Sequence, residues 1–106
     1  MNKKTLSPFD KQLLRRVSED SAFAKAFFEE LIERPLPVQL VFLRRMQGMS
    51  QKVLAGRLRV DQSYVSKIER PGSDHLISIY EKLAKFLHAR LAFVPLGAQI
   101  VWPKSS

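Results

Sequence analysis

Cysteine is absent from the 106 residues of the chain, and histidine occurs only twice. The first absence excludes disulfide bonds, thiolate metal ligands and a cysteine nucleophile, and it fits the reducing cytoplasm as the expected location. Neither His75 nor His88 has a second histidine or a carboxylate at the spacing that metal ligands need. The sequence therefore predicts no metal site and no cofactor.

Phosphate-binding loops and catalytic groups are also missing. The four glycines form no glycine-rich loop, and no serine is accompanied by a histidine and an acid at a convincing spacing. The nearest approach to a carboxylate pair is the group Glu29, Glu30 and Glu33, which falls on the outer side of a predicted helix with no cleft implied. We expect no catalytic residue, and hence a protein that is not an enzyme.

Long apolar runs are absent as well. No segment approaches the roughly 20 apolar residues that span a bilayer, and residues 1–8 lack the apolar stretch of a signal peptide. Hydrophobic residues make up 45% of the chain, which is enough for the core of one small domain. A cytoplasmic protein without membrane contact is the expectation.

Positive charge is what the chain has in excess, with a net charge of +8 from 18 basic and 10 acidic residues. Residues 1–35 hold seven basic and six acidic side chains, so they are nearly neutral. From residue 36 onward, eleven basic side chains face only four acidic ones. This asymmetry indicates that the later part of the chain binds a polyanion such as nucleic acid.

Prolines, helix caps and a change of apolar period divide the chain into a helical N-terminal extension, a basic domain and a C-terminal segment, which span residues 1–35, 36–88 and 89–106. In the extension, Ser7 and Pro8 predict the start of a helix that ends near Ser18. A second helix is predicted from about Asp20 to Arg34. Its apolar stripe either packs against the basic domain or docks a partner, and its glutamates are either solvated or face a basic partner. The candidate partner-binding residues are Phe23, Phe27, Glu29, Glu30 and Glu33.

Within the basic domain, residues 49–70 predict two short helices joined by a tight turn. Ser50 and Asp61 have the side chains of N-terminal caps and stand eleven residues apart. Apolar side chains then recur every three or four residues, and Ala55 is small enough to let the two helices cross closely. Further helices are predicted before and after this pair, over residues 37–47 and about 76–87.

On the second helix of the pair, the side chains left on the outside are polar and of a length suited to base edges and phosphates. The alternative is that they only solvate a surface helix. Two capped helices with a tight joint favour DNA recognition, because that arrangement is typical of a helix-turn-helix. The residues concerned are Gln62, Ser63, Tyr64, Ser66 and Lys67.

The C-terminal segment has two short apolar stretches, Arg90–Val94 and Gln99–Trp102, separated by the turn residues Pro95–Ala98. This pattern predicts a β-hairpin. Two strands alone are marginally stable and leave an open edge, so we expect the hairpin to pair with its copy in a homodimer. A two-fold dimer would also place two reading helices roughly 34 Å apart on a palindrome. The candidate dimerisation residues are Leu91, Phe93, Val94, Ile100 and Trp102.

Several motifs of residues 36–88 resemble the Xre/Cro-type helix-turn-helix family, namely Leu43-Arg44, Gly48-Met49-Ser50-Gln51, Leu54-Ala55, Val60, Ser63, Val65-Ser66-Lys67-Ile68-Glu69 and Leu83-Ala84. The resemblance implies an all-α, lambda-repressor-like domain of five helices that binds double-stranded DNA. It places Ser50 and Gln51 near the DNA backbone, the five outer residues above in the major groove, and Glu69 in a structural role beside a basic side chain. Arg59 and His88 stand where the family usually has glycine, and Arg59 adds a charge that can contact a phosphate.

The helical extension and the Leu-Ala-Phe-Val stretch after the motif resemble the flanks of chromosomal antitoxins of the HigA or HipB type. This resemblance implies a repressor that binds a palindromic operator in its own promoter and neutralises a cognate toxin. The toxin would be either a basic HigB- or RelE-like ribonuclease, bound by the extension, or a kinase-like HipA protein. Two alternatives stay open: a solitary phage- or plasmid-type regulator, and a protein-binding adaptor with only unspecific nucleic-acid contact.

Overall fold

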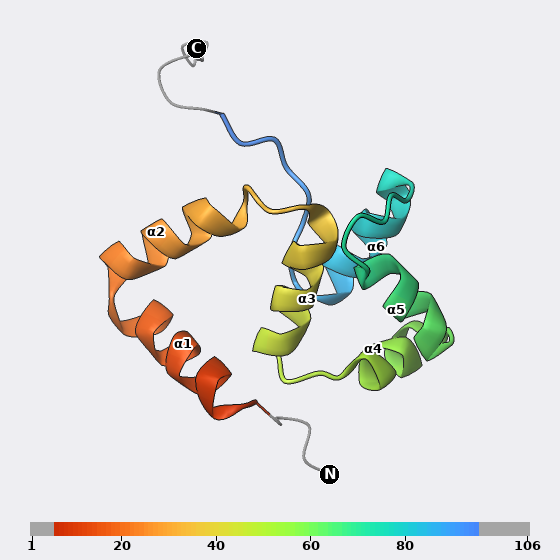
Figure 1. The fold of residues 1–106 in the computed structure, drawn as a ribbon, viewed down its shortest axis with the longest axis horizontal. Coiled ribbons are helices and arrows are strands. Elements are labelled where there is room, and N and C mark those ends of the chain that lie inside the picture. The colour runs from red at the N-terminus through yellow and green to blue at the C-terminus, as the bar shows by residue number, and fades with distance from the viewer. Residues whose placement is uncertain (1–5, 96–106) are drawn as a thin grey trace.

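The computed structural model describes residues 6–95, and this part of the chain is built from helices without any strand. Figure 1 shows their arrangement. The helices are α1 (Pro8–Glu19), α2 (Ser21–Leu31), α3 (Leu36–Met46), α4 (Gln51–Leu58), α5 (Gln62–Glu69) and α6 (Ile77–Phe86). No helix within these residues is long and apolar enough to cross a bilayer.

The two N-terminal helices begin where their caps predict. The Ser7 hydroxyl accepts the Asp10 N–H at 3.1 Å, and the Asp20 carboxylate accepts the Phe23 N–H at 3.0 Å. The second helix ends at Leu31, three residues before the predicted end at Arg34. The residue before a proline is disfavoured in a helix, so the chain already turns ahead of Pro35.

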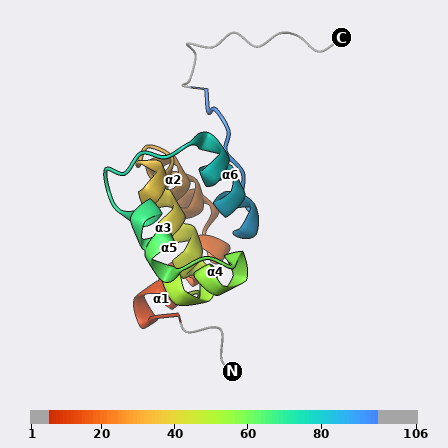
Figure 2. The ribbon, with the colours of Figure 1, turned by 90° about the vertical axis from the view of Figure 1, so that its right-hand side faces the viewer.

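The hydrophobic core of the described residues lies within the four helices α3–α6, the residues that join them and Leu87, which directly follows α6. Its buried members are Leu40, Met49, Leu54, Ala55, Leu58, Val65, Ile68, Tyr80, Leu83 and Leu87. Figure 1 shows α1 and α2 on one side of α3, with α4, α5 and α6 on the other side, and Figure 2 looks at that second side. We call α1 and α2 together the arm, and it contributes no apolar residue to the buried core.

An ion pair and an aromatic pair connect the arm to α3. The nearly buried Asp10 carboxylate accepts two hydrogen bonds from the half-exposed Arg45 guanidinium, at 3.0 and 3.2 Å. The rings of Phe27 and Phe42 lie 5.0 Å apart between centroids. The apolar stripe of α2 therefore packs against the domain only in part, because Phe28 and Ile32 stay exposed.

One sequence-based expectation about the basic domain is wrong. Residues 36–88 hold four helices and not the five that the resemblance implies. After α6, His88 adopts a left-handed conformation (φ 59°), so the helix does not continue. The Ala89 N–H then closes onto the Ala84 carbonyl at 2.8 Å, and the chain continues without helical structure. The other three helices of this domain, α3, α4 and α5, start within one residue of the predicted positions.

The predicted β-hairpin is not supported either. Residues 90–94 form no strand within the described chain, which fits the weakness of a strand without a neighbour to pair with. Leu91 packs against the core, whereas Phe93 and Val94 are exposed. The other two predicted dimerisation residues, Ile100 and Trp102, lie outside the described residues.

Candidate nucleic-acid interface

The joint between α4 and α5 is a left-handed turn at Arg59 (φ 60°, ψ 46°). Its N–H bonds to the Gly56 carbonyl at 3.2 Å, and the Val60 N–H bonds to the Ala55 carbonyl at 3.0 Å. A side chain other than glycine carries a steric cost in this conformation, so Arg59, which stands where the resemblance expects glycine, strains the turn. Ala55 is buried where the helices cross, as predicted.

The two helices of the motif begin differently. The Ser50 hydroxyl oxygen accepts the Val53 N–H at 3.1 Å, so the predicted cap of α4 is confirmed. Asp61 occupies the cap position of α5, but its side chain makes no capping hydrogen bond, and this prediction is wrong. The reason is that the Tyr64 N–H bonds instead to the backbone carbonyl of Asp61 at 3.0 Å. The exposed Asp61 carboxylate is left facing solvent.

The inner side of α5 is fixed by Val65 and Ile68, which are almost fully buried. Of the five predicted reading residues, the structure leaves four exposed and one, Ser66, half-buried. Arg70, the C-cap of α5, is a further exposed basic residue that was not among the predicted site residues. It follows Ser63 by seven positions and Lys67 by three, which is the spacing of one helix face, so the signal was present. The exposed predicted residues are Gln62, Ser63, Tyr64 and Lys67.

A buried ion pair holds the end of the reading helix. The Arg44 guanidinium donates from Nε and Nη2 to the two carboxylate oxygens of Glu69, at 2.6 and 2.9 Å, and from Nη1 to the Met49 carbonyl at 2.8 Å. The structural role predicted for Glu69 is confirmed. Charge-assisted, bidentate bonds of this kind are strong and fix geometry, so α3 holds both the last turn of α5 and the loop before α4.

Gln51 joins the same network. Its side-chain N–H donates to Glu69 Oε1 at 2.9 Å, and the residue is half-buried. The first turn of α4 is thereby tied to the last turn of α5. The predicted contact of Gln51 with the DNA backbone would have to use its remaining amide oxygen, its second amide hydrogen or its backbone N–H, whereas the exposed Ser50 keeps its hydroxyl hydrogen available.

Positive charge covers the outside of the motif. Residues 50–70 carry five basic side chains that are all exposed and that form no ion pair within the described part of the chain. Of the two acidic residues in this segment, Glu69 is neutralised by Arg44, which leaves only Asp61 to oppose them. A surface of this charge attracts phosphates. The basic residues are Lys52, Arg57, Arg59, Lys67 and Arg70.

The buried polar groups leave nothing unsatisfied for a ligand. Every buried side-chain nitrogen and oxygen of residues 6–95 has a hydrogen-bond partner. In the same residues, no group of three histidine, aspartate or glutamate side chains could hold a metal ion. The polar and basic groups available to a ligand at this site are the exposed ones of α4 and α5.

Comparison with curated proteins and with solved structures gives no match. Residues 42–93 do match a family model, which is described as a helix-turn-helix. The matched segment begins within α3 and includes α4, α5 and α6. This agrees with the resemblance to the Xre/Cro-type motif, and it supports a DNA-binding transcriptional regulator whose helix-turn-helix consists of α4 and α5.

Proposed function

We propose that the protein is a dimeric, sequence-specific transcriptional repressor that binds a palindromic operator through residues 50–70. The observation that carries the proposal is the exposed polar and basic face of α5, held in place by the buried Arg44–Glu69 pair. Rigid support matters because base recognition depends on side chains that are already positioned before DNA arrives. The proposed role is binding and not catalysis.

We also propose that the protein is an antitoxin, which represses its own operon and neutralises a cognate toxin through the arm. Three features of the arm support this part. It adds nothing to the buried core, Phe28 on α2 and Ile32 directly after it are exposed, and the acidic residues Glu29 and Glu33 lie on α2 and just after it. An apolar surface beside carboxylates suits a basic protein such as a HigB- or RelE-like ribonuclease, with a HipA-like kinase as the other candidate toxin.

A solitary Xre-type regulator is the second candidate. The observation that favours it is the pair of contacts between the arm and α3, at Asp10–Arg45 and Phe27–Phe42, because these give the arm a structural role without any toxin. An adaptor with unspecific nucleic-acid contact is the third. Only the exposed charge of α4 and α5 speaks for it, and that charge serves a specific reader equally well.

The division of labour between the motif and the arm can be tested with the double variant Gln62→Ala/Lys67→Ala. Each protomer loses one base contact and one phosphate contact, so operator binding by the dimer should weaken by about 100-fold or more and its salt dependence should fall by about two units. Binding of the toxin should not change. The control is Lys82→Ala, which removes an exposed lysine from α6, outside both the motif and the arm. Equal loss of DNA and toxin binding would contradict the proposal.

A gel shift with the DNA upstream of the gene separates the three candidates. A specific reader should prefer this DNA to a scrambled sequence by roughly 1,000-fold or more, whereas an adaptor loses affinity for both sequences alike as salt rises. Adding the product of the adjacent gene should change the shift of an autoregulating antitoxin. A specific shift that is indifferent to that product would favour the solitary regulator.

A further inference from the structure

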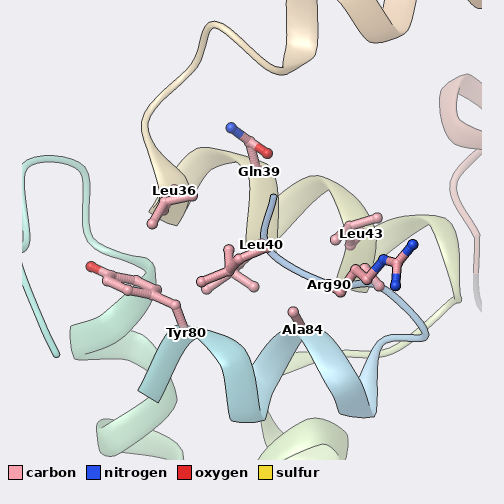
Figure 3. A pocket seen from close by; sticks show the side chains of 9 residues that line it. Leu36, Gln39, Leu40, Leu43, Tyr80, Ala84 and Arg90 are labelled. Carbon is pink, nitrogen blue, oxygen red and sulfur yellow. The ribbon is translucent and has the colours of Figure 1, made fainter. Parts of the chain in front are cut away.

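A groove lies between the turn that links α2 to α3 and the chain that follows α6. Its apolar floor includes Ile32, Leu36 and Leu91, and its volume is about 730 Å³. Below the floor it adjoins the small cavity between α3 and α6 that Figure 3 shows, where Leu36 and Leu40 face Tyr80 and Ala84. We call this feature the C-terminal groove.

Both walls of the C-terminal groove are held in place. On one wall, the Gln39 side chain of α3 donates to the Arg34 carbonyl at 2.8 Å and so fixes the turn after α2. On the other wall, the Ala89 N–H bonds to the Ala84 carbonyl and Leu91 packs against the core. A groove with fixed walls binds at a lower entropic cost, because little has to be ordered when the occupant arrives.

Phe93 stands at the edge of this groove and is fully exposed. Its ring does not fill the groove beside it, and Val94 next to it is half exposed. A protruding aromatic side chain and an apolar groove therefore lie on one surface of the same molecule. That is the requirement for a two-fold interface, in which the same patch of both copies supplies the protruding residue and the site that receives it.

The charged residues around the groove are also arranged so that two copies of the chain can complement each other. Glu33 stands on one wall and Arg90 on the opposite wall, and neither forms an ion pair within residues 6–95. Arg34, the third charged residue of the groove, is already paired with Glu30. In a two-fold contact, Glu33 of each copy can meet Arg90 of the other, so the patch is complementary to itself in charge as well as in shape.

We propose that a second copy of this chain occupies the C-terminal groove, with Phe93 of each copy inserted between the α2–α3 turn and the last described residues of the other. The inference rests on the dimeric regulator proposed above and specifies which surfaces meet. It gives the end of α2 a place in the dimer interface. A protein that binds the arm near Ile32 then competes with dimerisation, and operator binding weakens as a consequence.

The first test measures the dimer dissociation constant of the full chain by sedimentation equilibrium. Phe93→Ala should raise it by about 100-fold, since a buried aromatic anchor is worth at least a factor of ten and occurs twice in the dimer. Phe93 makes no contact with the core, so the thermal unfolding of the monomer should not change. The matched control is Phe86→Ala, an exposed phenylalanine of α6 outside the groove, which should leave the constant unchanged. A Phe93→Ala variant that dimerises like the wild type overturns the inference, as does a monomeric wild type.

The second test exchanges the two charges of the groove walls. Glu33→Arg and Arg90→Glu should each weaken the dimer by about tenfold, because each places two pairs of like charges across the interface. The double variant Glu33→Arg/Arg90→Glu should restore most of the dimer affinity. The inference is overturned if the single variants dimerise like the wild type, or if the double variant dimerises as weakly as the single variants.

DNA-binding measurements test the proposed function independently of the dimer interface. If the Phe93→Ala monomer still prefers a single half-site over scrambled DNA, the regulator stands whatever the dimer interface is. If the wild type has no preference among DNA sequences, the proposed function fails while the test of the groove keeps its meaning.

Discussion

Replacing Arg44 by methionine is the change that tests the support of the reading helix most directly. Arg44 and Glu69 are only 9% and 6% exposed, and the arginine makes three of the hydrogen bonds that hold α3, α5 and the loop before α4. In Arg44→Met the Glu69 carboxylate stays buried with Gln51 as its remaining donor. We expect a loss of about 3–5 kcal/mol in the free energy of unfolding, the usual cost of a buried charge without its partner.

That loss is large for a protein of this size. At about 0.05–0.15 kcal/mol per residue, a chain of 106 residues has a total stability of roughly 5–16 kcal/mol. Urea denaturation followed by far-ultraviolet circular dichroism measures the change, since the midpoint should fall while the slope stays the same. The double variant Arg44→Met/Glu69→Leu removes both charges and should regain stability to within about 1 kcal/mol of the wild type.

Operator binding should not recover with stability. Without Glu69 the Gln51 side chain loses its acceptor, so the start of α4 and the end of α5 are no longer tied together. We expect the double variant to be well folded and to bind the operator more weakly than the wild type. A loss below about 1 kcal/mol in the single variant, or a double variant as unstable as the single, would refute the reasoning.

Two further predictions concern the ends of the motif helices. Ser50→Ala should lower the free energy of unfolding by about 1 kcal/mol because it removes a cap, while Asp61→Ala should change it by less than about 0.5 kcal/mol because its side chain caps nothing. Equal urea midpoints for these two variants would contradict the structure. Arg59→Gly should raise the free energy of unfolding by about 0.5–1 kcal/mol, because glycine adopts φ 60° without strain. The urea midpoint should rise accordingly. A lower midpoint would show that the arginine side chain contributes more than its backbone costs.

Local features of the fold could be predicted from the sequence because their causes are local. Ser7, Asp20 and Ser50 bond to N–H groups three residues away, so the residue type and its position before an apolar run suffice to place three helix starts. Asp61 has the same signature and does not cap. Whether a side chain or a backbone carbonyl takes the free N–H depends on the turn before it, which the sequence pattern does not specify.

For contacts between residues far apart in the sequence, at most the kind of partner could be predicted and not its identity. A basic partner for Glu69 was expected, but nothing in the pattern identifies Arg44, which stands 25 residues earlier. The pair Asp10–Arg45 spans 35 residues and was not predicted at all, because both residues look like ordinary surface charges in a sequence. The exposed face of α5 was predictable from helical spacing, because Val65 and Ile68 mark the buried side.

The attachment of the arm has a consequence for local unfolding. An ion pair, whose arginine side chain is 50% exposed, and an aromatic contact are among the contacts that join α1 and α2 to α3, and none of the buried apolar core of residues 6–95 belongs to α1 or α2. The arm can open as a separate cooperative unit while α3–α6 stay folded, so its amide hydrogens should exchange with solvent at a lower free energy than those of the core. Lifting the arm therefore requires only a fraction of the total stability, and a protein that binds its inner face does not have to unfold the helix-turn-helix.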